Sequence, residues 1–300
     1  MTIAIAWVRR IRDCEELVFV SDSRLSGDGR TFDGCPKILT LPRSDCAISF
    51  AGYTGHAFPM MLQLALAIDS FEPSKRGSLD IATVRTHAIK VFDGMAQQIK
   101  SSTRINIEQD TSPAATFLFG GYSWINKEFQ LWSFSFRAGG KSFVADPSNW
   151  VAYSKEANRV IYRKSRRTRT DQYLGEIAFA GDQAELAKQL LLDKLNQRAE
   201  NQKPLDMEPF EVIRDMLRDP RHSETIGGSP QVVKVYQYMK TASLGVYWPD
   251  RATGSVHLQG RACLGYEQVS PFILDPDTLI SEAQPPIKAP DTVIDTKTEE

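Results

Sequence analysis

The fold prediction starts from the N-terminal sequence MTIAIAWV, residues 1–8. Together with ELVFVSDS, residues 16–23, it gives two segments whose alternating apolar residues predict half-buried β-strands. The charged sequence RRIRDCE, residues 9–15, lies between them. We therefore expect the chain to begin with a β-hairpin that has a long loop.

The same N-terminal stretch lacks the features of a secretory signal. Such a signal has a basic n-region, a longer apolar core and a small-residue cleavage site. Here the apolar run is short, and Arg9, Arg10 and Arg12 follow it instead of preceding it. These features predict a mature N-terminus and a cytoplasmic location.

The composition predicts a globular protein with a substantial core. The chain has 300 residues, of which 42% are hydrophobic, and it has no apolar run long enough for a membrane helix. Its formal charge of -1 gives no overall attraction to nucleic acid or to an anionic membrane. We expect neither as a partner.

The cysteines and histidines predict neither a disulfide framework nor a metal site. The cysteines show no C-x-x-C pair, and the histidines show no metal-ligand spacing. We therefore expect reduced thiols and no bound metal. The residues concerned are Cys14, Cys35, Cys46, Cys263, His56, His87, His222 and His257.

The periodicity along the chain predicts strands, two helices, strands, two helices and strands again. Further strands are expected at 37–41, 46–52, 115–123, 128–136, 175–182, 231–239, 243–249, 254–260 and 263–269, and helices at 55–71, 84–99, 183–199 and 208–219. In helix 183–199, we expect Leu186, Leu190, Leu191 and Leu195 to form the apolar stripe.

Two segments are predicted to lie outside the core. Residues 275–300 are rich in proline, charge and threonine, which predicts a disordered C-terminal tail. The basic sequence YRKSRRTR, residues 162–169 with a cluster from Arg163 to Arg169, fits either a solvated surface loop or a docking site for an acidic partner. The sequence does not separate these two interpretations.

Four short motifs follow one another in the first part of the chain. Thr2 heads the first strand, VFVSDSR (18–24) ends the second, CPKI (35–38) opens the third, and FAGYTGHA (50–57) joins the fourth to a helix. In this order they resemble the N-terminal-nucleophile hydrolases of the proteasome β-subunit type, including bacterial threonine peptidases that start directly after methionine. The resemblance covers about residues 2–260 and is strongest over the first seventy.

The resemblance implies a fold, an activity and a site. The implied fold class is α+β, a four-layer αββα sandwich of two mainly antiparallel sheets flanked by helix pairs, as a single domain over residues 2–270. The implied enzyme is a threonine-type peptidase without a cofactor. Thr2 would be the nucleophile and its α-amine the base, with Asp22 and Lys37 beside it and the Gly52 backbone N–H in the oxyanion hole.

This chemistry requires removal of Met1, because only then is the α-amine of Thr2 free. The small threonine side chain makes that removal the expected outcome. A free α-amine has a pKa of about 7.7–8, close to the operating pH. A neighbouring ammonium disfavours a second positive charge and favours an alkoxide, while a carboxylate offsets the cost of burying the lysine.

Each of these residues also has a purely structural interpretation. Thr2 would be an ordinary first strand residue, Asp22 would form a surface ion pair with Arg24, Lys37 would be solvated, and Gly52 would be a turn glycine. The presence of all four residues in the order of the family favours the catalytic interpretation.

Two later motifs depart from the family pattern. In FAGDQAE, residues 179–185, Asp182 stands where a small hydroxyl or a glycine is expected. In SETIGGSP, residues 223–230, Ile226 stands where the family has a serine. We therefore treat Asp182, Ser223 and Glu224 as candidate supporting residues.

The leading hypothesis is an N-terminal threonine hydrolase that cleaves amide bonds in peptides or unfolded proteins. One alternative is a catalytically silent proteasome-fold subunit that serves assembly or binding. Another is an amidase of the same superfamily that acts on a small-molecule amide. Silent subunits carry an N-terminal extension, and its absence here favours the enzyme. The resemblance also implies a homo-oligomer, as a ring or stacked assembly, and the sequence identifies no ATPase partner.

Overall fold

Strands β1 (Ala4–Ile11) and β2 (Cys14–Ser21) form the hairpin on which the site is built. They belong to a computed structural model that describes residues 2–284 except 28, 100–112, 165–170, 199, 201, 223, 238–239 and 270. The two strands pair antiparallel without interruption, from Ala4 opposite Ser21 to Ile11 opposite Cys14. The first strand therefore carries Thr2 directly to the end of a sheet.

The turn of this hairpin is shorter than predicted. The charged residues at both strand ends continue the ladder, and Arg10 forms an ion pair with Glu15 across it. Only Arg12 and Asp13 remain in the turn, and Arg12 takes a left-handed φ of 53°. The predicted long loop is wrong because cross-strand ion pairs allow charged residues to stay in strands.

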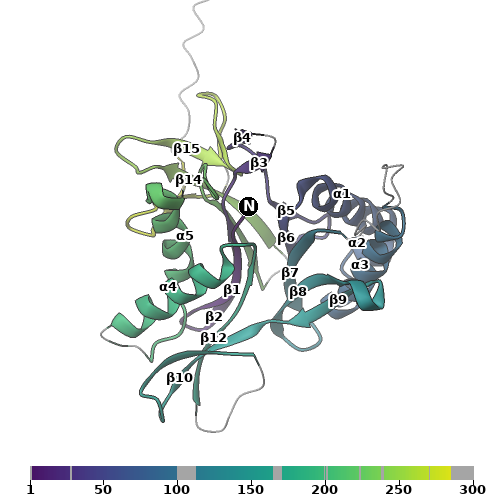
Figure 1. The fold of residues 1–300 in the computed structure, drawn as a ribbon, viewed down its shortest axis with the longest axis horizontal. Coiled ribbons are helices and arrows are strands. Elements are labelled where there is room, and N and C mark those ends of the chain that lie inside the picture. The colour runs from purple at the N-terminus through teal and green to yellow at the C-terminus, as the bar shows by residue number, and fades with distance from the viewer. Residues whose placement is uncertain are drawn as a thin grey trace, which may run out of the picture.

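Two stacked sheets organise the described part of the chain (Figure 1). The larger has 11 strands, in the order β11-β10-β12-β1-β2-β13-β14-β15-β16, with β17 and β18 joined beside β14. The smaller has five strands, in the order β5-β6-β7-β8-β9, and β3 pairs with β4 in a separate two-stranded sheet.

The remaining strand bounds are as follows. In the larger sheet they are β10 (Asn149–Ser154), β11 (Arg159–Arg163), β12 (Asp171–Ala180), β13 (Gln231–Tyr236), β14 (Lys240–Trp248), β15 (Ser255–Leu258), β16 (Arg261–Ala262), β17 (Ile273–Leu274) and β18 (Ser281–Glu282). In the other two sheets they are β3 (Leu25–Gly27), β4 (Arg30–Phe32), β5 (Ile38–Thr40), β6 (Cys46–Gly52), β7 (Ala115–Ser123), β8 (Glu128–Arg137) and β9 (Ser142–Pro147).

Alternation along β1 explains how the layers pack. Ile5 and Trp7 point into a core cluster shared with helices α4 (Ala184–Gln197) and α5 (Glu208–Arg218). Ala4 and Ala6 point the other way, into a cluster with residues of β6, β7 and β8 from the smaller sheet. Successive strand residues face opposite sides of a sheet, so one strand serves both interfaces.

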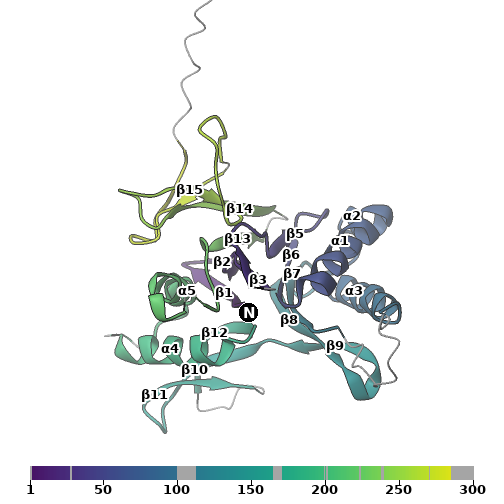
Figure 2. The same ribbon diagram turned by 45° about the horizontal axis from the view of Figure 1, so that its top comes forward.

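The helices of the first half cover the outer face of the smaller sheet. Helices α1 (Thr54–Ser70) and α3 (Ile81–Ala96) bury residues such as Leu64 and Phe92 against it, and the short α2 (Glu72–Lys75) lies between them in sequence. The Asp80 side chain caps α3 by accepting from the Ala82 amide. Figure 2 shows these helices on the side of the sheets opposite α4 and α5.

The predicted apolar stripe of helix α4 is only half correct. Leu191 and Leu195 are buried, but Leu186 and Leu190 are each 37% exposed, and Ala187 takes a core position instead. Ala187, Leu191 and Leu195 are spaced at four-residue steps and lie on one face of the helix. The larger leucines beside them lie toward the rim of that face.

The predicted fold class is wrong. Of the described residues, 40% are in strands and 26% in helices, and the large antiparallel sheets make the protein more β-rich than an αββα sandwich. The strands missing from the prediction include β9, β10 and β11, and also very short ones such as β3, β4 and β16, which are two or three residues long. Segments this short carry no readable periodicity, so the sequence prediction left them as loops.

The C-terminal region also differs from its prediction. Residues 275–284 are not a tail: Asp275 is buried, and β18 pairs with β17. Residues 285–300 lie outside the described part. Residues 263–269 were predicted as a strand but are irregular, and the basic cluster falls partly in β11 and partly in the undescribed residues 165–170.

Candidate active site

Thr2 lies two residues before β1, and only 2% of it is exposed. The side-chain ammonium of Lys37 donates to its hydroxyl, with Nζ 3.1 Å from Oγ1. Lys37 reaches this point because it directly precedes β5 on the neighbouring sheet. The candidate nucleophile and the lysine therefore come from different sheets.

Asp22 completes this buried group. It directly follows β2, and its Oδ1 lies 2.8 Å from Lys37 Nζ; both side chains are 0% exposed. The Asp22 carboxylate also accepts from the backbone amides of Ile3, Arg24 and Gly227. Four donors thus fix the carboxylate, which in turn fixes the lysine.

Burial acts on both charges of the pair. It lowers the pKa of Lys37 and raises the pKa of Asp22, because a charged group loses its hydration when it is buried. The attraction between the two groups opposes both shifts. A lysine with a lowered pKa releases its proton more readily than one in water.

The structural interpretations of Asp22 and Lys37 do not hold. Lys37 is not solvated, and the charged partner of Asp22 is Lys37 instead of Arg24. Arg24 donates its backbone amide to Asp22, while its guanidinium pairs with Asp33 at 2.6 and 2.7 Å.

Asp182 contacts the backbone of the candidate nucleophile. Its Oδ1 accepts from the backbone nitrogen of Thr2 at 2.6 Å. The approach depends on Gly181, which follows β12 with φ of 110°, and a Cβ at that position would lie 1.9 Å from the Thr2 carbonyl oxygen. A glycine is required there because the two backbones nearly touch.

Gly52 ends β6 beside Thr2. Its φ is 111°, and a Cβ there would lie 2.4 Å from the carbonyl oxygen of Ala114. This backbone conformation and close approach favour glycine. Helix α1 starts two residues later and has no acidic residue in its first turn. The positive end of the helix dipole therefore lies two residues from Gly52, with no acidic residue in the first turn of the helix.

Glu224, another candidate supporting residue, does not join this group. Ser223 lies outside the described residues, and Glu224 is exposed to solvent. Within residues 223–230, the backbone amide of Gly227 donates a hydrogen bond to the Asp22 carboxylate. Ile226 is buried in the core, and its carbonyl oxygen accepts from Arg24.

Sequence reasoning missed Gln231. This residue starts β13, is 0% exposed, and accepts from the Lys37 backbone nitrogen at 2.9 Å. Its amide group donates to the carbonyl oxygens of Cys35 and Asp22, at 2.6 and 3.3 Å. One side chain thus joins the segments that carry both charges of the site. The only signal in the sequence is a glutamine at the head of an apolar strand.

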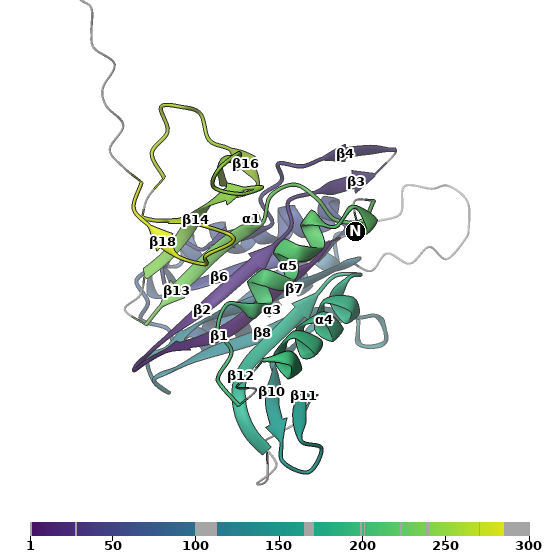
Figure 3. The same ribbon diagram turned by 90° about the vertical axis from the view of Figure 1, so that its left-hand side faces the viewer.

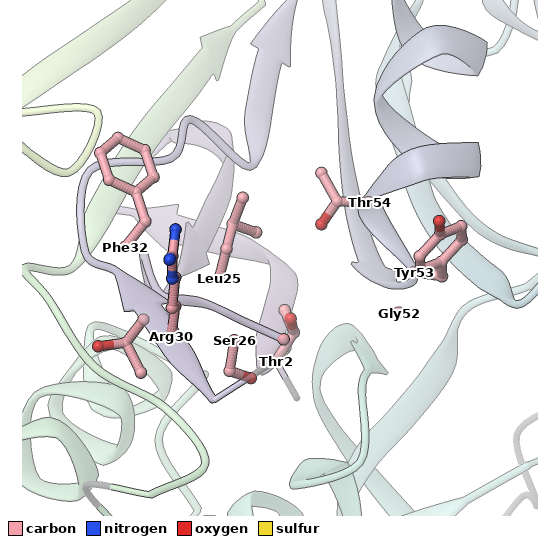
Figure 4. Close-up of a pocket in the computed structure, with 10 residues that line it drawn as sticks. Thr2, Leu25, Ser26, Arg30, Phe32, Gly52, Tyr53 and Thr54 are labelled. Carbon is pink, nitrogen blue, oxygen red and sulfur yellow. The ribbon is translucent and has the colours of Figure 1, made fainter.

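A cavity of about 580 Å³ opens at Thr2. It is lined by Thr2, Leu25, Ser26, Gly27, Arg30, Thr31, Phe32, Gly52, Tyr53 and Thr54. Figure 4 shows the residues of the β3–β4 hairpin on one side, Gly52, Tyr53 and Thr54 on the other, and Thr2 between them. A substrate in this cavity would contact both the hydroxyl of Thr2 and the Gly52 backbone.

No protein-family model matches this chain, and no well-characterised protein matches it in sequence. Within the described residues, no group of three or more His, Cys, Asp or Glu side chains could hold a metal ion. No helix in that part of the chain is long and apolar enough to cross a membrane. The function must therefore be argued from the geometry of the site.

Proposed function

We propose that this protein is an N-terminal threonine hydrolase that cleaves amide bonds, with Thr2 as the nucleophile once Met1 has been removed. The observation that carries the proposal is the buried contact between Lys37 Nζ and Thr2 Oγ1, 3.1 Å apart, backed by Asp22. A nucleophilic hydroxyl needs a nearby group that favours its ionised form.

The energetics of the buried pair support a chemical role. Removing two charges from water is costly, and well-packed apolar residues often give equal or greater stability. Asp22 and Lys37 nevertheless occupy a fully buried position and aim an ammonium at a hydroxyl. That arrangement adds little to packing but stabilises a developing alkoxide.

The first half of the reaction forms an ester. Thr2 Oγ1 bonds to the carbonyl carbon of the substrate, and the hydroxyl proton passes to the α-amine. The carbonyl electron pair moves onto oxygen, which accepts a hydrogen bond from the Gly52 amide. The carbon–nitrogen bond then breaks, the α-ammonium gives its proton to the leaving nitrogen, and the acyl group remains on Thr2.

The second half restores the enzyme. A water molecule bonds to the ester carbon and passes a proton to the α-amine. The bond to Oγ1 then breaks, and Oγ1 takes that proton back as the carboxylic acid leaves. Asp182 accepts a hydrogen bond from the Thr2 nitrogen and would hold the α-amine in place during both transfers.

The proposal extends to substrate class and setting. Peptides are the favoured substrates, and a small-molecule amide is the alternative within the same chemistry. The four cysteines are free, which supports a reducing, cytoplasmic setting. The competing function is a silent subunit that serves assembly or binding, and a homo-oligomer is expected with either function.

Covalent labelling tests the proposal. Protein with Met1 removed, verified by intact mass, should react with a β-lactone or epoxyketone probe, and peptide mapping should locate the label on Thr2. Thr2→Ala should abolish labelling without unfolding, while Thr2→Ser should retain part of it. Thr86→Ala is the matched control, since Thr86 is an exposed threonine on α3. A label elsewhere, or none on processed protein, would favour the silent subunit.

A further inference from the structure

The β3–β4 hairpin forms a separate wall of the cavity beside Thr2. It pairs Leu25 with Phe32 and Gly27 with Arg30, and it belongs to neither large sheet. In Figure 3 it projects next to the N-terminus. The wall is therefore placed to contact the part of a substrate that lies next to the scissile bond.

The base of the hairpin is tied to the candidate active site. Arg24 and Asp33 flank its two strands and form a bidentate ion pair, with contacts of 2.6 and 2.7 Å. Ser23 adds a hydrogen bond to the Asp33 carbonyl oxygen. Since Asp22 precedes Ser23 directly, the wall and the buried charge pair share one rigid segment.

The cavity lining carries one kind of charge. Among the ten described residues that line it, Arg30 is the only one with a charged side chain, and none of these ten carries a carboxylate. The nearest acidic residue on the hairpin base, Asp33, is already paired with Arg24. Arg30 has no ion pair with a described residue, and its side chain is exposed to solvent.

The surroundings of Arg30 leave it accessible. Its cross-strand neighbour is Gly27, where an added Cβ would meet nothing within 4 Å. Figure 4 shows the side chains of Arg30, Leu25 and Phe32 extending to the same side of the hairpin. Phe32 is 61% and Tyr53 59% exposed, so aromatic surface borders the cationic group.

We propose that Arg30 selects substrates with a carboxylate on the acyl side of the scissile amide. The inference rests on the proposed function, because it names the substrate class of the same cavity. A guanidinium binds a carboxylate through paired hydrogen bonds, and the apolar rings beside it favour the methylene groups that carry the carboxylate. An acidic peptide side chain and a small dicarboxylic acid monoamide share this chemistry.

The test compares fluorogenic tripeptide amides that end in Glu, Gln or Lys, together with glutaryl anilide as the small-molecule arm. The Glu peptide should exceed its isosteric Gln partner about tenfold in kcat/KM, which corresponds to ~1.4 kcal/mol. Added salt should reduce this preference, because Arg30 is exposed. The kcat/KM values of the Glu peptide and of glutaryl anilide are then compared. The higher value shows whether the recognised carboxylate belongs to a peptide side chain or to a small dicarboxylic acid monoamide.

Variants of Arg30 connect the preference to this residue. Arg30→Gln should make the Glu and Gln peptides equal, and Arg30→Glu should favour the Lys peptide. Arg12→Gln should leave the preference intact, since Arg12 is an exposed arginine in the turn at the far end of β1. A preference that survives Arg30→Gln, or no preference at all, would overturn the inference.

Two further measurements separate this inference from the proposed function. Labelling of Thr2 by a neutral β-lactone should proceed equally in wild type and Arg30→Gln, because that probe carries no carboxylate. Fluorescence anisotropy with the inactive Thr2→Ala variant should show tighter binding of the Glu peptide than of the Gln peptide. If labelling fails while this binding difference persists, the hydrolase proposal falls and the carboxylate site stands. Equal binding of both peptides would reject the site.

Discussion

The Gln231 side chain accepts a hydrogen bond from the Lys37 backbone nitrogen at 2.9 Å, across 194 residues of sequence. Through its amide group, it also holds the carbonyl oxygens of Cys35 and Asp22. Gln231 therefore sets the distance between the two charges of the site without touching Thr2 through any of these bonds. Its predicted role is to position Lys37.

We expect Gln231→Leu to lower the free energy of unfolding by about 1–3 kcal/mol, because the Lys37 amide and the Cys35 carbonyl lose their partner while buried. Labelling of Thr2 should slow, and the pH dependence of labelling should shift. Gln189→Leu serves as a control, since Gln189 is an exposed residue of α4 that bonds to Asp193. A stability loss with an unchanged pH profile would reject the positioning role.

Lys37→Met should abolish labelling and destabilise the fold. Breaking a buried ion pair by removing one partner costs about 3–5 kcal/mol, since Asp22 would remain buried without its cation. The double variant Lys37→Met/Asp22→Asn should recover part of this stability but none of the labelling. Chemical denaturation of the three proteins measures the first effect, and mass spectrometry the second.

The lowered pKa of Lys37 also predicts a pH dependence of stability. Between its folded pKa and the ordinary value of 10.5, the unfolded chain binds a proton that the folded protein does not. The stability of wild type relative to Lys37→Met should therefore rise with pH across that window. Denaturation curves of both proteins at several alkaline pH values test the sign, and a constant or falling difference would contradict the burial effect.

Asp182 should set the pH at which the base becomes active. A carboxylate 2.6 Å from the Thr2 nitrogen favours the protonated α-amine, while the Lys37 ammonium opposes it, so the pH midpoint of the labelling rate should depend on both groups. Asp182→Asn should lower that midpoint by up to about one pH unit. Glu224→Gln should not, because Glu224 is exposed. Identical midpoints in all three proteins would exclude this role.

Arg43 should matter for stability and not for reactivity. Its guanidinium pairs with Asp45 with both side chains almost fully buried, and it also donates to the carbonyl oxygens of Ser74 and Leu79. Arg43→Ala should lower the free energy of unfolding by about 3–5 kcal/mol, whereas Arg76→Ala, in the exposed pair with Glu72, should cause no measurable change. Near-equal stability of the two variants would contradict the buried network.

The segment that ends at Gln284 should be needed for a stable core. The Gln284 side chain accepts from the Val269 amide, Glu282 pairs with Arg251, and β18 pairs with β17. A chain cut after Ile280 loses all three contacts, whereas one cut after Gln284 keeps them. The first should melt at a lower temperature than the second, and equal melting temperatures would show that β18 contributes little.

The family resemblance, placed on the predicted strands, indicated three members of the group around Thr2. Thr2 lies two residues before β1, Asp22 directly follows β2 and Lys37 directly precedes β5, so the predicted strands placed them near strand ends, while their roles came from the resemblance. Gln231 and the contact of Asp182 could not be predicted in this way, because they depend on which distant strands become neighbours. The proportion of strand was also underestimated, since pairs such as β17 and β18 form only through tertiary contacts.

The contact between Gly181 and Thr2 has a practical consequence for handling the protein. With the two backbones this close and Asp182 on the Thr2 nitrogen, the amino end of Thr2 is enclosed at the site. Any affinity tag fused ahead of Thr2 would keep the amine acylated and lead its linker past the cavity. Purification tags therefore belong at the carboxyl end, because an N-terminally tagged preparation should fail the labelling test even when the folded site is intact.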